Sequence, residues 1–225
     1  MKKSYKVAII PAYNEEQRIG LVLHTLKKYV DTIIVVDDGS TDKTSEKCNI
    51  NGVVLMKHAI NLGQGAALQT GFDFAKKLNP DVVITFDADG QFEAKEIQKI
   101  ISPIIHDDYD IVLGSRFLGS TTNMPLSRWI ILKLGIVFTY LFSGILLTDT
   151  HNGFRAFNNK TLHTIYLHQN RMSYASELID QIKQYNLRYK EVPVTIKYDS
   201  YTLKKGQKNY NAINIIINLL FEKLT

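Results

Sequence analysis

Apolar and polar residues alternate along the chain with two different periods. Short runs rich in apolar and β-branched residues predict buried strands at residues 6–10, 32–36, 53–56, 81–86 and 110–113. Between these runs, apolar side chains recur at the spacing of an amphipathic helix. Strands that alternate with helices predict βαβ units. We therefore expect one α/β domain over residues 1–225, with a mostly parallel, Rossmann-like sheet and flanking helices.

Polar residues mark where some of these helices are expected to begin. Asn14 followed by Gln17 has the spacing of a capping box, which predicts a helix start at Asn14. Cap-type residues at positions 40–42 predict a second helix that reaches about Cys48. Later in the chain, we expect helices over residues 93–106, 159–167 and 174–185, a strand over 189–196 and a lysine-rich loop over 198–209.

Residues 129–147 differ from the rest of the chain because Lys133 is their only charged residue. A segment of 19 residues is long enough to cross a membrane. A single crossing would separate Asp87 from Arg155, so one site built from both halves of the chain argues against it. Two interpretations remain: contact with the membrane interface, for which Trp129 is a suitable residue, or packing in the core or in a dimer.

The last segment, residues 209–225, is predicted to form an amphipathic helix. Its apolar stripe is wider than one contact with a core requires. This width predicts a surface that faces a membrane or another subunit.

Composition limits the possible partners. The single cysteine, Cys48, excludes an internal disulfide framework and a cysteine-based zinc site, and it fits a reducing, cytoplasmic setting. The formal charge of +5 favours anionic partners such as phosphates or an acidic membrane surface. Because the positive charge is not in one block and lacks interleaved aromatic residues, we expect no nucleic acid partner.

The strongest chemical signal is the sequence Asp87-Ala88-Asp89-Gly90-Gln91, which directly follows a predicted strand. In open α/β sheets, ligands bind at the carboxyl ends of the strands. Carboxylates spaced two positions apart, with an amide oxygen two further on, suit a hard divalent cation that keeps phosphate oxygens among its ligands. The sequence thus predicts a metal and diphosphate site.

Other strand ends add polar groups to the same edge of the sheet. The first two strands are followed by Glu15 and by Asp37-Asp38, whose carboxylates can accept hydrogen bonds from a base or a ribose. The glycine-rich dinucleotide fingerprint is absent from the first turn. The fifth strand ends near Arg116, which is suited to bidentate contact with phosphate.

Four short motifs at residues 11–15, 36–40, 87–91 and 149–155 together carry a family resemblance. In this order and spacing, they resemble glycosyltransferase family 2, whose members have the GT-A fold. Within that family the chain is similar to the polyprenyl-phosphate sugar synthases. The resemblance covers about residues 5–200.

The resemblance implies roles for individual residues. The catalytic residues would be Asp89, Arg116 and Arg128, of which Arg116 contacts phosphate and Arg128 faces the acceptor phosphate. The cofactor would be Mg²⁺ or Mn²⁺, held by Asp87, Asp89 and Gln91. The nucleotide sugar would be bound by Pro11, Tyr13, Glu15, Asp37, Asp38, Asp87, Ala88, Lys205 and Lys208. Around the two lysines, Gly206-Gln207-Lys208 departs from the family's G-x-S-K pattern, so either lysine can be the one that contacts the diphosphate.

The absence of one catalytic base from the sequence indicates the type of acceptor. Family members that transfer a sugar to a sugar hydroxyl typically carry an aspartate base in a Glu-Asp pair, and this chain has no such pair. Asp149 and Glu177 are the nearby substitutes. A lipid monophosphate has a second pKa of about 6 and needs no base, only cations to position it. We therefore expect inverting transfer from a nucleotide-diphosphate sugar to a polyprenyl phosphate.

Three other functions remain open alongside this expectation. The first is transfer to a sugar hydroxyl of a lipid-linked or wall glycan, and the second is nucleotidyl transfer. The third is a non-catalytic subunit that binds the nucleotide sugar. The main hypothesis places the enzyme at the cytoplasmic face of the cell membrane, in peripheral contact, with a homo-oligomer or a membrane-protein partner as possible assemblies. His151, inside the fourth motif, is expected to be structural or adjacent to substrate rather than a metal ligand.

Overall fold

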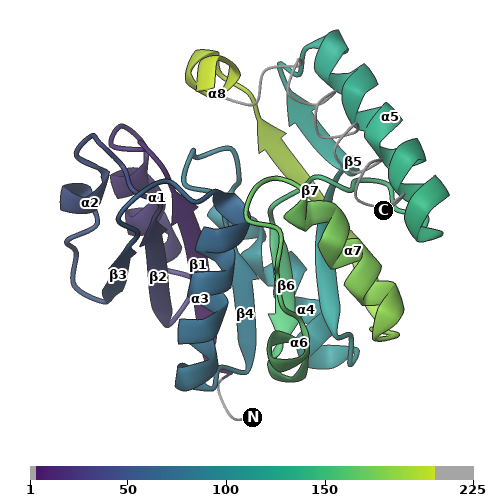
Figure 1. Ribbon diagram of the computed structural model, residues 1–225, viewed down its shortest axis with the longest axis horizontal. Coiled ribbons are helices and arrows are strands. Elements are labelled where there is room, and N and C mark those ends of the chain that lie inside the picture. The colour runs from purple at the N-terminus through teal and green to yellow at the C-terminus, as the bar shows by residue number, and fades with distance from the viewer. Residues whose placement is uncertain (1–3, 206–225) are drawn as a thin grey trace.

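The computed structural model describes residues 4–205, so the predicted C-terminal helix and Lys208 lie outside the described residues. A seven-stranded sheet forms the centre of the molecule, with strand order β3-β2-β1-β4-β6-β5-β7 (Figure 1). Its strands are β1 (Lys6–Ala12), β2 (Thr32–Asp37), β3 (Val53–Lys57), β4 (Val82–Thr85), β5 (Ile111–Thr122), β6 (Arg155–Asn158) and β7 (Tyr189–Lys197).

The helices follow the strands in the alternating order that the sequence predicts. They are α1 (Ile19–Leu26), α2 (Thr44–Lys47), α3 (Gln64–Leu78), the 3-10 turn η1 (Ala94–Glu96), α4 (Ile97–His106), α5 (Leu126–Ser143), α6 (Asn159–Thr164), α7 (Tyr174–Gln184) and α8 (Ser200–Lys205). The predicted α/β fold with a mostly parallel sheet is therefore confirmed.

One strand runs against the others. β6 pairs antiparallel with both β4 and β5, and Arg155 lies opposite Thr85 on one side and Leu113 on the other. Because β6 is reversed, it begins at the edge where the parallel strands end. The preceding motif, residues 149–155, is thereby brought to the carboxyl ends of β4 and β5.

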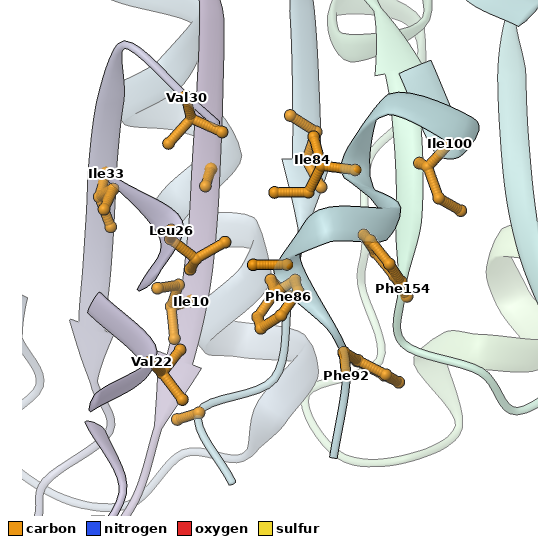
Figure 2. Close-up of a cluster of buried hydrophobic side chains, with 14 of the residues drawn as sticks. Ile10, Val22, Leu26, Val30, Ile33, Ile84, Phe86, Phe92, Ile100 and Phe154 are labelled. Atoms are coloured by element: carbon orange, nitrogen blue, oxygen red, sulfur yellow. The ribbon is translucent and has the colours of Figure 1, made fainter. Parts of the chain in front are cut away.

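Each face of the sheet carries its own hydrophobic core, as the alternation of side chains along a strand requires. Ala8 and Ile10 of β1 point into one core with α1 and α4, whereas Val7 and Ile9 point into the other with α3, α6 and α7. Figure 2 shows the first core, where Ile10, Ile33 and Ile84 of neighbouring strands meet the helical residues Val22, Leu26 and Ile100.

Two local predictions are wrong for a physical reason. Asn14 does not cap a helix: it has a positive φ of 54°, and its side-chain oxygen accepts a hydrogen bond from the Thr41 N–H. α1 instead begins at Ile19 without a side-chain cap. The segment predicted as a loop after β7 contains α8, because Asp199 and Thr202 exchange hydrogen bonds at its start.

The long apolar segment forms α5, three residues earlier than predicted at its start. It ends at Gly144, whose φ of +73° is a left-handed conformation typical of helix C-termini. Within the described residues, α5 is the one helix that is long and apolar enough to cross a membrane, and 17% of it is buried. In Figure 1 it lies at the margin of the molecule, away from β1 and β4.

Candidate active site

The candidate site lies at the carboxyl ends of β1 and β4, two neighbouring strands from which the sheet extends in opposite directions. From β1 the sheet continues through β2 to β3, and from β4 it continues through β6 to β7. Such a switch point opens a crevice outside the carboxyl ends of the strands, where α/β proteins bind ligands. Glu15 follows β1 here, and Asp87 follows β4.

Residues from three separate parts of the chain fix the surroundings of Asp87. The Gln64 side chain, at the start of α3, donates to Asp87 Oδ1 at 3.1 Å. A Cβ at Gly153 would lie only 2.8 Å from each Asp87 carboxylate oxygen. The Thr85 hydroxyl, in β4, donates to the Gly153 carbonyl at 2.7 Å and fixes this close approach. The aspartate motif and the motif at 149–155 thus form one structure.

Three aromatic rings support these two motifs from below. Phe86 and Phe92 flank the aspartate motif, and Phe154 lies in the 149–155 motif. Their ring centroids lie 5.2–5.3 Å apart in each pair, and all three are buried (Figure 2). Because interiors are densely packed, the rings fix the positions of the loops above them.

The two aspartates of the motif repel each other in a poorly solvated position. Burial, followed by the charge of Asp89, raises the pKa of Asp87 to about 7. Burial likewise raises the pKa of Asp89 to about 6. A bound divalent cation would remove this penalty, so the residues present fit the predicted metal. Mg²⁺ sites need only one or two carboxylates when substrate phosphates supply further ligands.

No larger ligand cluster accompanies these aspartates. Within residues 4–205, no group of three or more His, Cys, Asp or Glu side chains is arranged to hold a metal ion. Gln91 is anchored through its backbone: its N–H donates to Asp89 Oδ1 at 2.9 Å, and its carbonyl accepts from Lys197 N–H at 3.0 Å. Its role as a third metal ligand stays a prediction.

Asp37 and Asp38 shape the loops around the predicted nucleoside pocket. Asp37 is fully buried and accepts hydrogen bonds from the Ser40 N–H and the Ser45 hydroxyl. Asp38 accepts from the backbone N–H groups of Leu62 and Gly63 at 2.9 and 2.7 Å, and His58 Nδ1 lies 2.7 Å from it. Contact with the nucleotide stays a prediction for both aspartates.

Glu15 lies beneath α8. The Tyr201 hydroxyl donates to one of its carboxylate oxygens at 2.9 Å, and Lys205 Nζ lies 2.6 Å from the other. The structure therefore brings together two residues, Glu15 and Lys205, that the sequence predicts at one nucleotide site. Of the other predicted contacts, Pro11 is buried in β1, Ala88 is buried beside the aspartates, and Tyr13 is exposed after β1.

Arg116 is buried and bound to Asp149. Its Nε donates to Asp149 Oδ2 at 2.6 Å, and its backbone N–H donates to the same oxygen at 3.0 Å. Burial lowers the pKa of this guanidinium, but the charge of Asp149 and the hydrogen bonds to Asp149 and Tyr198 outweigh that effect and the pKa is raised. Asp149 is therefore a permanent partner of an arginine.

Arg128 lies in the first turn of α5, on the side of the metal motif. Its charge offsets part of the burial that raises the pKa of Asp89. Its guanidinium carbon lies 5.6 Å from the centroid of the Tyr198 ring. Positive charge from Arg128 and from Lys205 thus reaches Asp89 from different elements.

Glu177 and His151 both contact neighbouring parts of the fold. Glu177 accepts hydrogen bonds from the backbone N–H groups of His168 and Gln169, so it fixes the loop before α7. Burial lowers the pKa of His151 to about 4, which keeps its ring neutral. The ring packs against α5, where a Cβ at Gly135 would lie 3.0 Å from it.

Sequence reasoning missed Gln64 beside Asp87, and it included Gly153 and Arg155 only as members of the 149–155 motif, without individual roles. Arg155 is buried, donates to the carbonyls of Asn152 and Thr150, and lowers the pKa of Asp87 against the larger effect of burial. The density of polar groups in motif 149–155 was a signal for Gly153 and Arg155. Gln64 had no comparable signal, because it lies outside the four motifs and begins a helix that is distant from Asp87 in the sequence.

Comparison with known proteins supports the assignment of this geometry to a family. The family model for glycosyl transferase family 2 matches residues 7–166. The chain is 36% identical to a UDP-N-acetylglucosamine–dolichyl-phosphate N-acetylglucosaminyltransferase of Methanococcus voltae, over 96% of this chain and 95% of the relative. It is 28% identical to an undecaprenyl-phosphate mannosyltransferase of Micrococcus luteus, over 84% and 82% of the two chains.

A solved structure shows the same fold. Glucosyl-3-phosphoglycerate synthase from Mycobacterium tuberculosis, in complex with Mn²⁺, uridine diphosphate and glucosyl-3-phosphoglycerate, superposes with a TM-score of 0.71. The match covers 96% of this chain and 79% of the synthase, at 16% identity. The sheet is thus the GT-A sheet that the motifs implied, and the protein is a glycosyltransferase that belongs to glycosyl transferase family 2.

Proposed function

We propose that this enzyme transfers a sugar from a nucleotide-diphosphate sugar to a polyprenyl phosphate, with inversion at the anomeric carbon. One observation carries the proposal: the paired carboxylates Asp87 and Asp89 lie beside Arg116 and Arg128. By contrast, the two acidic residues considered as a base, Asp149 and Glu177, are held by internal hydrogen bonds. Such a site suits an acceptor that is already an anion.

The residues divide the work between a leaving group and a nucleophile. A divalent cation bound at Asp87 and Asp89 would neutralise the departing diphosphate and orient it. Arg116 and Arg128 hold the acceptor phosphate by charge, with no proton to remove. Glu15 and Lys205 bind the nucleotide end, which requires α8 to stay close to β1. Attack from the side opposite the leaving group gives the inverted product.

Contact with a membrane surface is part of the proposal, because a polyprenyl phosphate is embedded in lipid. α5 carries a stripe of exposed apolar residues at helical spacing, namely Leu126, Ile130, Leu134, Val137 and Leu141. Trp129 and Tyr140 flank it, and α5 has no acidic residue. A helix with this composition can lie in the interface with its apolar side in the acyl region.

The names of two relatives favour lipid phosphate over a sugar hydroxyl as acceptor. One is a dolichyl-phosphate transferase and the other an undecaprenyl-phosphate transferase. Transfer to a sugar hydroxyl is the second candidate, because family 2 as a whole does not fix the acceptor.

Product analysis tests the acceptor. The purified full-length protein is incubated with Mn²⁺, undecaprenyl phosphate and each member of a panel of nucleotide sugars. We expect a lipid product whose sugar is released by mild acid. A product that resists mild acid and forms only with a glycan acceptor would instead establish glycosidic transfer.

A further inference from the structure

Tyr198 touches both arginines of the proposed acceptor site. Its hydroxyl accepts a hydrogen bond from Arg116 Nη1 at 2.7 Å. Its ring lies beneath Arg128, with 5.6 Å between the guanidinium carbon and the ring centroid. Arg116 comes from β5 and Arg128 from α5, so one side chain links two cations that the chain supplies from different elements.

The position of Tyr198 is itself fixed. The residue is 2% exposed, and its backbone N–H donates to the Thr122 carbonyl at 3.1 Å, at the end of the pairing between β5 and β7. The next residue, Asp199, caps α8. Tyr198 therefore stands between the arginine pair and the helix that covers Glu15.

The hydroxyl also determines how Arg116 is oriented. Asp149 accepts a hydrogen bond from Nε, on one edge of the guanidinium, and Tyr198 accepts one from Nη1. With two anchors the planar fork has one orientation, whereas a single anchor at Nε would leave it free to rotate. The two bonds use only part of the donor set of a guanidinium, so further N–H groups stay available to an anion.

We propose that Tyr198 is a positioning residue that sets the orientation of Arg116 and the spacing between Arg116 and Arg128 for binding of the acceptor phosphate. This inference rests on the proposed function. It adds a residue that the sequence motifs do not include and assigns it to the acceptor side of the site.

The test is Tyr198→Phe, which keeps the buried ring and removes only the hydroxyl. Tyr5→Phe is the matched control, because the Tyr5 hydroxyl also has one partner, Thr32 Oγ1 at 2.9 Å, outside the site. Initial rates are measured with undecaprenyl phosphate varied at saturating donor, and with donor varied at saturating acceptor. We expect Tyr198→Phe to raise the KM for the lipid phosphate about tenfold, the value of one hydrogen bond to a charged group, and to leave the donor KM unchanged.

A purely structural role gives a different pattern. If Tyr198 only fills the core, Tyr198→Phe lowers the melting temperature as Tyr5→Phe does. The KM values for the lipid phosphate and for the donor then stay equal to those of the wild type. That result would overturn the inference while leaving the proposed function standing. A wild-type protein that does not use the lipid phosphate at all would overturn both.

A second variant probes the same contact from the other side. Arg116→Lys keeps the charge but loses the planar fork. We expect it to raise the acceptor KM as well, and we expect Tyr198→Phe to add less than about twofold in that background, because the two changes break one contact. Independent, multiplying effects would contradict a role that acts through Arg116.

Discussion

The carboxylates of Asp87 and Asp89 destabilise the folded protein when no cation is bound. Burial raises the pKa of each, and a neighbouring carboxylate adds to the effect: the charge of Asp89 for Asp87, and the charge of Glu15 for Asp89. Neighbouring residues restrict the position of Asp87 but do not replace the hydration that its carboxylate loses on burial. Gln64 donates one hydrogen bond to this carboxylate, and Gly153 lies directly against it. Functional sites often retain such unfavourable arrangements because the ligand relieves them.

The first prediction concerns stability as a function of pH. The folded-state pKa of Asp87 is about 7, above the ordinary value of about 3.9, so stability is lost as the pH rises between these values. Asp87→Asn cannot ionise and escapes this loss. We expect the metal-free variant to melt several degrees above the metal-free wild type at pH 8, because each 1 kcal/mol of this loss shifts the melting temperature of a chain of this length by roughly 2–4 °C. The difference should disappear at pH 4.

Asp108→Asn is the control for that experiment, because the Asp108 side chain is 93% exposed. Thermal denaturation of the three proteins at both pH values decides the matter. A wild type as stable as Asp87→Asn at pH 8 would mean that the Asp87 carboxylate is well solvated.

The second prediction is that a single methyl group at position 153 damages the site. In Gly153→Ala, the new Cβ would lie 2.8 Å from both oxygens of Asp87, so the carboxylate must move. We expect kcat to fall roughly 10- to 100-fold with the melting temperature nearly unchanged, since small displacements of reacting groups cost large factors in rate.

Gly20→Ala is the matched control, because a Cβ there has no atom within 4 Å. Its activity should equal that of the wild type. Equal activity of Gly153→Ala would show that the close approach of Gly153 to Asp87 is not needed for turnover.

Among the secondary-structure elements, those with a strong local pattern were predictable and those fixed by distant partners were not. β2 and α7 are marked by continuous or periodic apolar residues, and their predicted bounds differ from the observed ones by one residue. β6 has only four residues and exists because β4 and β5 flank it, which no local pattern reveals. Asn14 has the spacing of a helix cap, but Thr41, far along the chain, recruits its side chain.

α5 shows the same division between local and distant information. Its length and apolar character were evident from the sequence, but the sequence left both membrane contact and protein packing open. The structure adds that Leu134 and Leu141 are 57% and 72% exposed, whereas Gly135 and Thr139 face the protein.

The third prediction therefore concerns the exposed side of α5. Replacing both Leu134 and Leu141 with Ser removes two large apolar side chains from the stripe, each worth about 1.5–3 kcal/mol on burial in lipid. We expect the fraction that sediments with phosphatidylglycerol-containing vesicles to fall at least tenfold. Leu21→Ser, at an exposed position of α1, should bind like the wild type.

Size-exclusion chromatography of the same variants separates the two interpretations of α5. The membrane proposal is wrong if three results occur together: the wild type elutes as a dimer, the double variant elutes as a monomer, and vesicle binding is the same for both. The stripe is then a subunit interface.

At the scale of the whole molecule, the sheet topology explains why motifs that are far apart in the sequence lie together at one site. Motifs 11–15, 36–40 and 87–91 follow parallel strands and share an edge of the sheet, so their proximity could be expected from βαβ order alone. The fourth motif joins them only because β6 is reversed. Contacts such as Tyr201 and Lys205 with Glu15 depend on α8 returning across the sheet from β7, which local patterns do not encode.

The central claim is that a nucleoside diphosphate leaves from Asp87 and Asp89 while a lipid phosphate attacks. Its most direct test is the nucleoside diphosphate released by the full-length protein, measured with and without undecaprenyl phosphate, in the presence of Mn²⁺ and the preferred donor. We expect release to depend on the lipid phosphate, to fall to background in Asp89→Ala and to persist in Asp108→Ala. Turnover by Asp89→Ala at the wild-type rate, or release that does not depend on lipid phosphate, would contradict the claim.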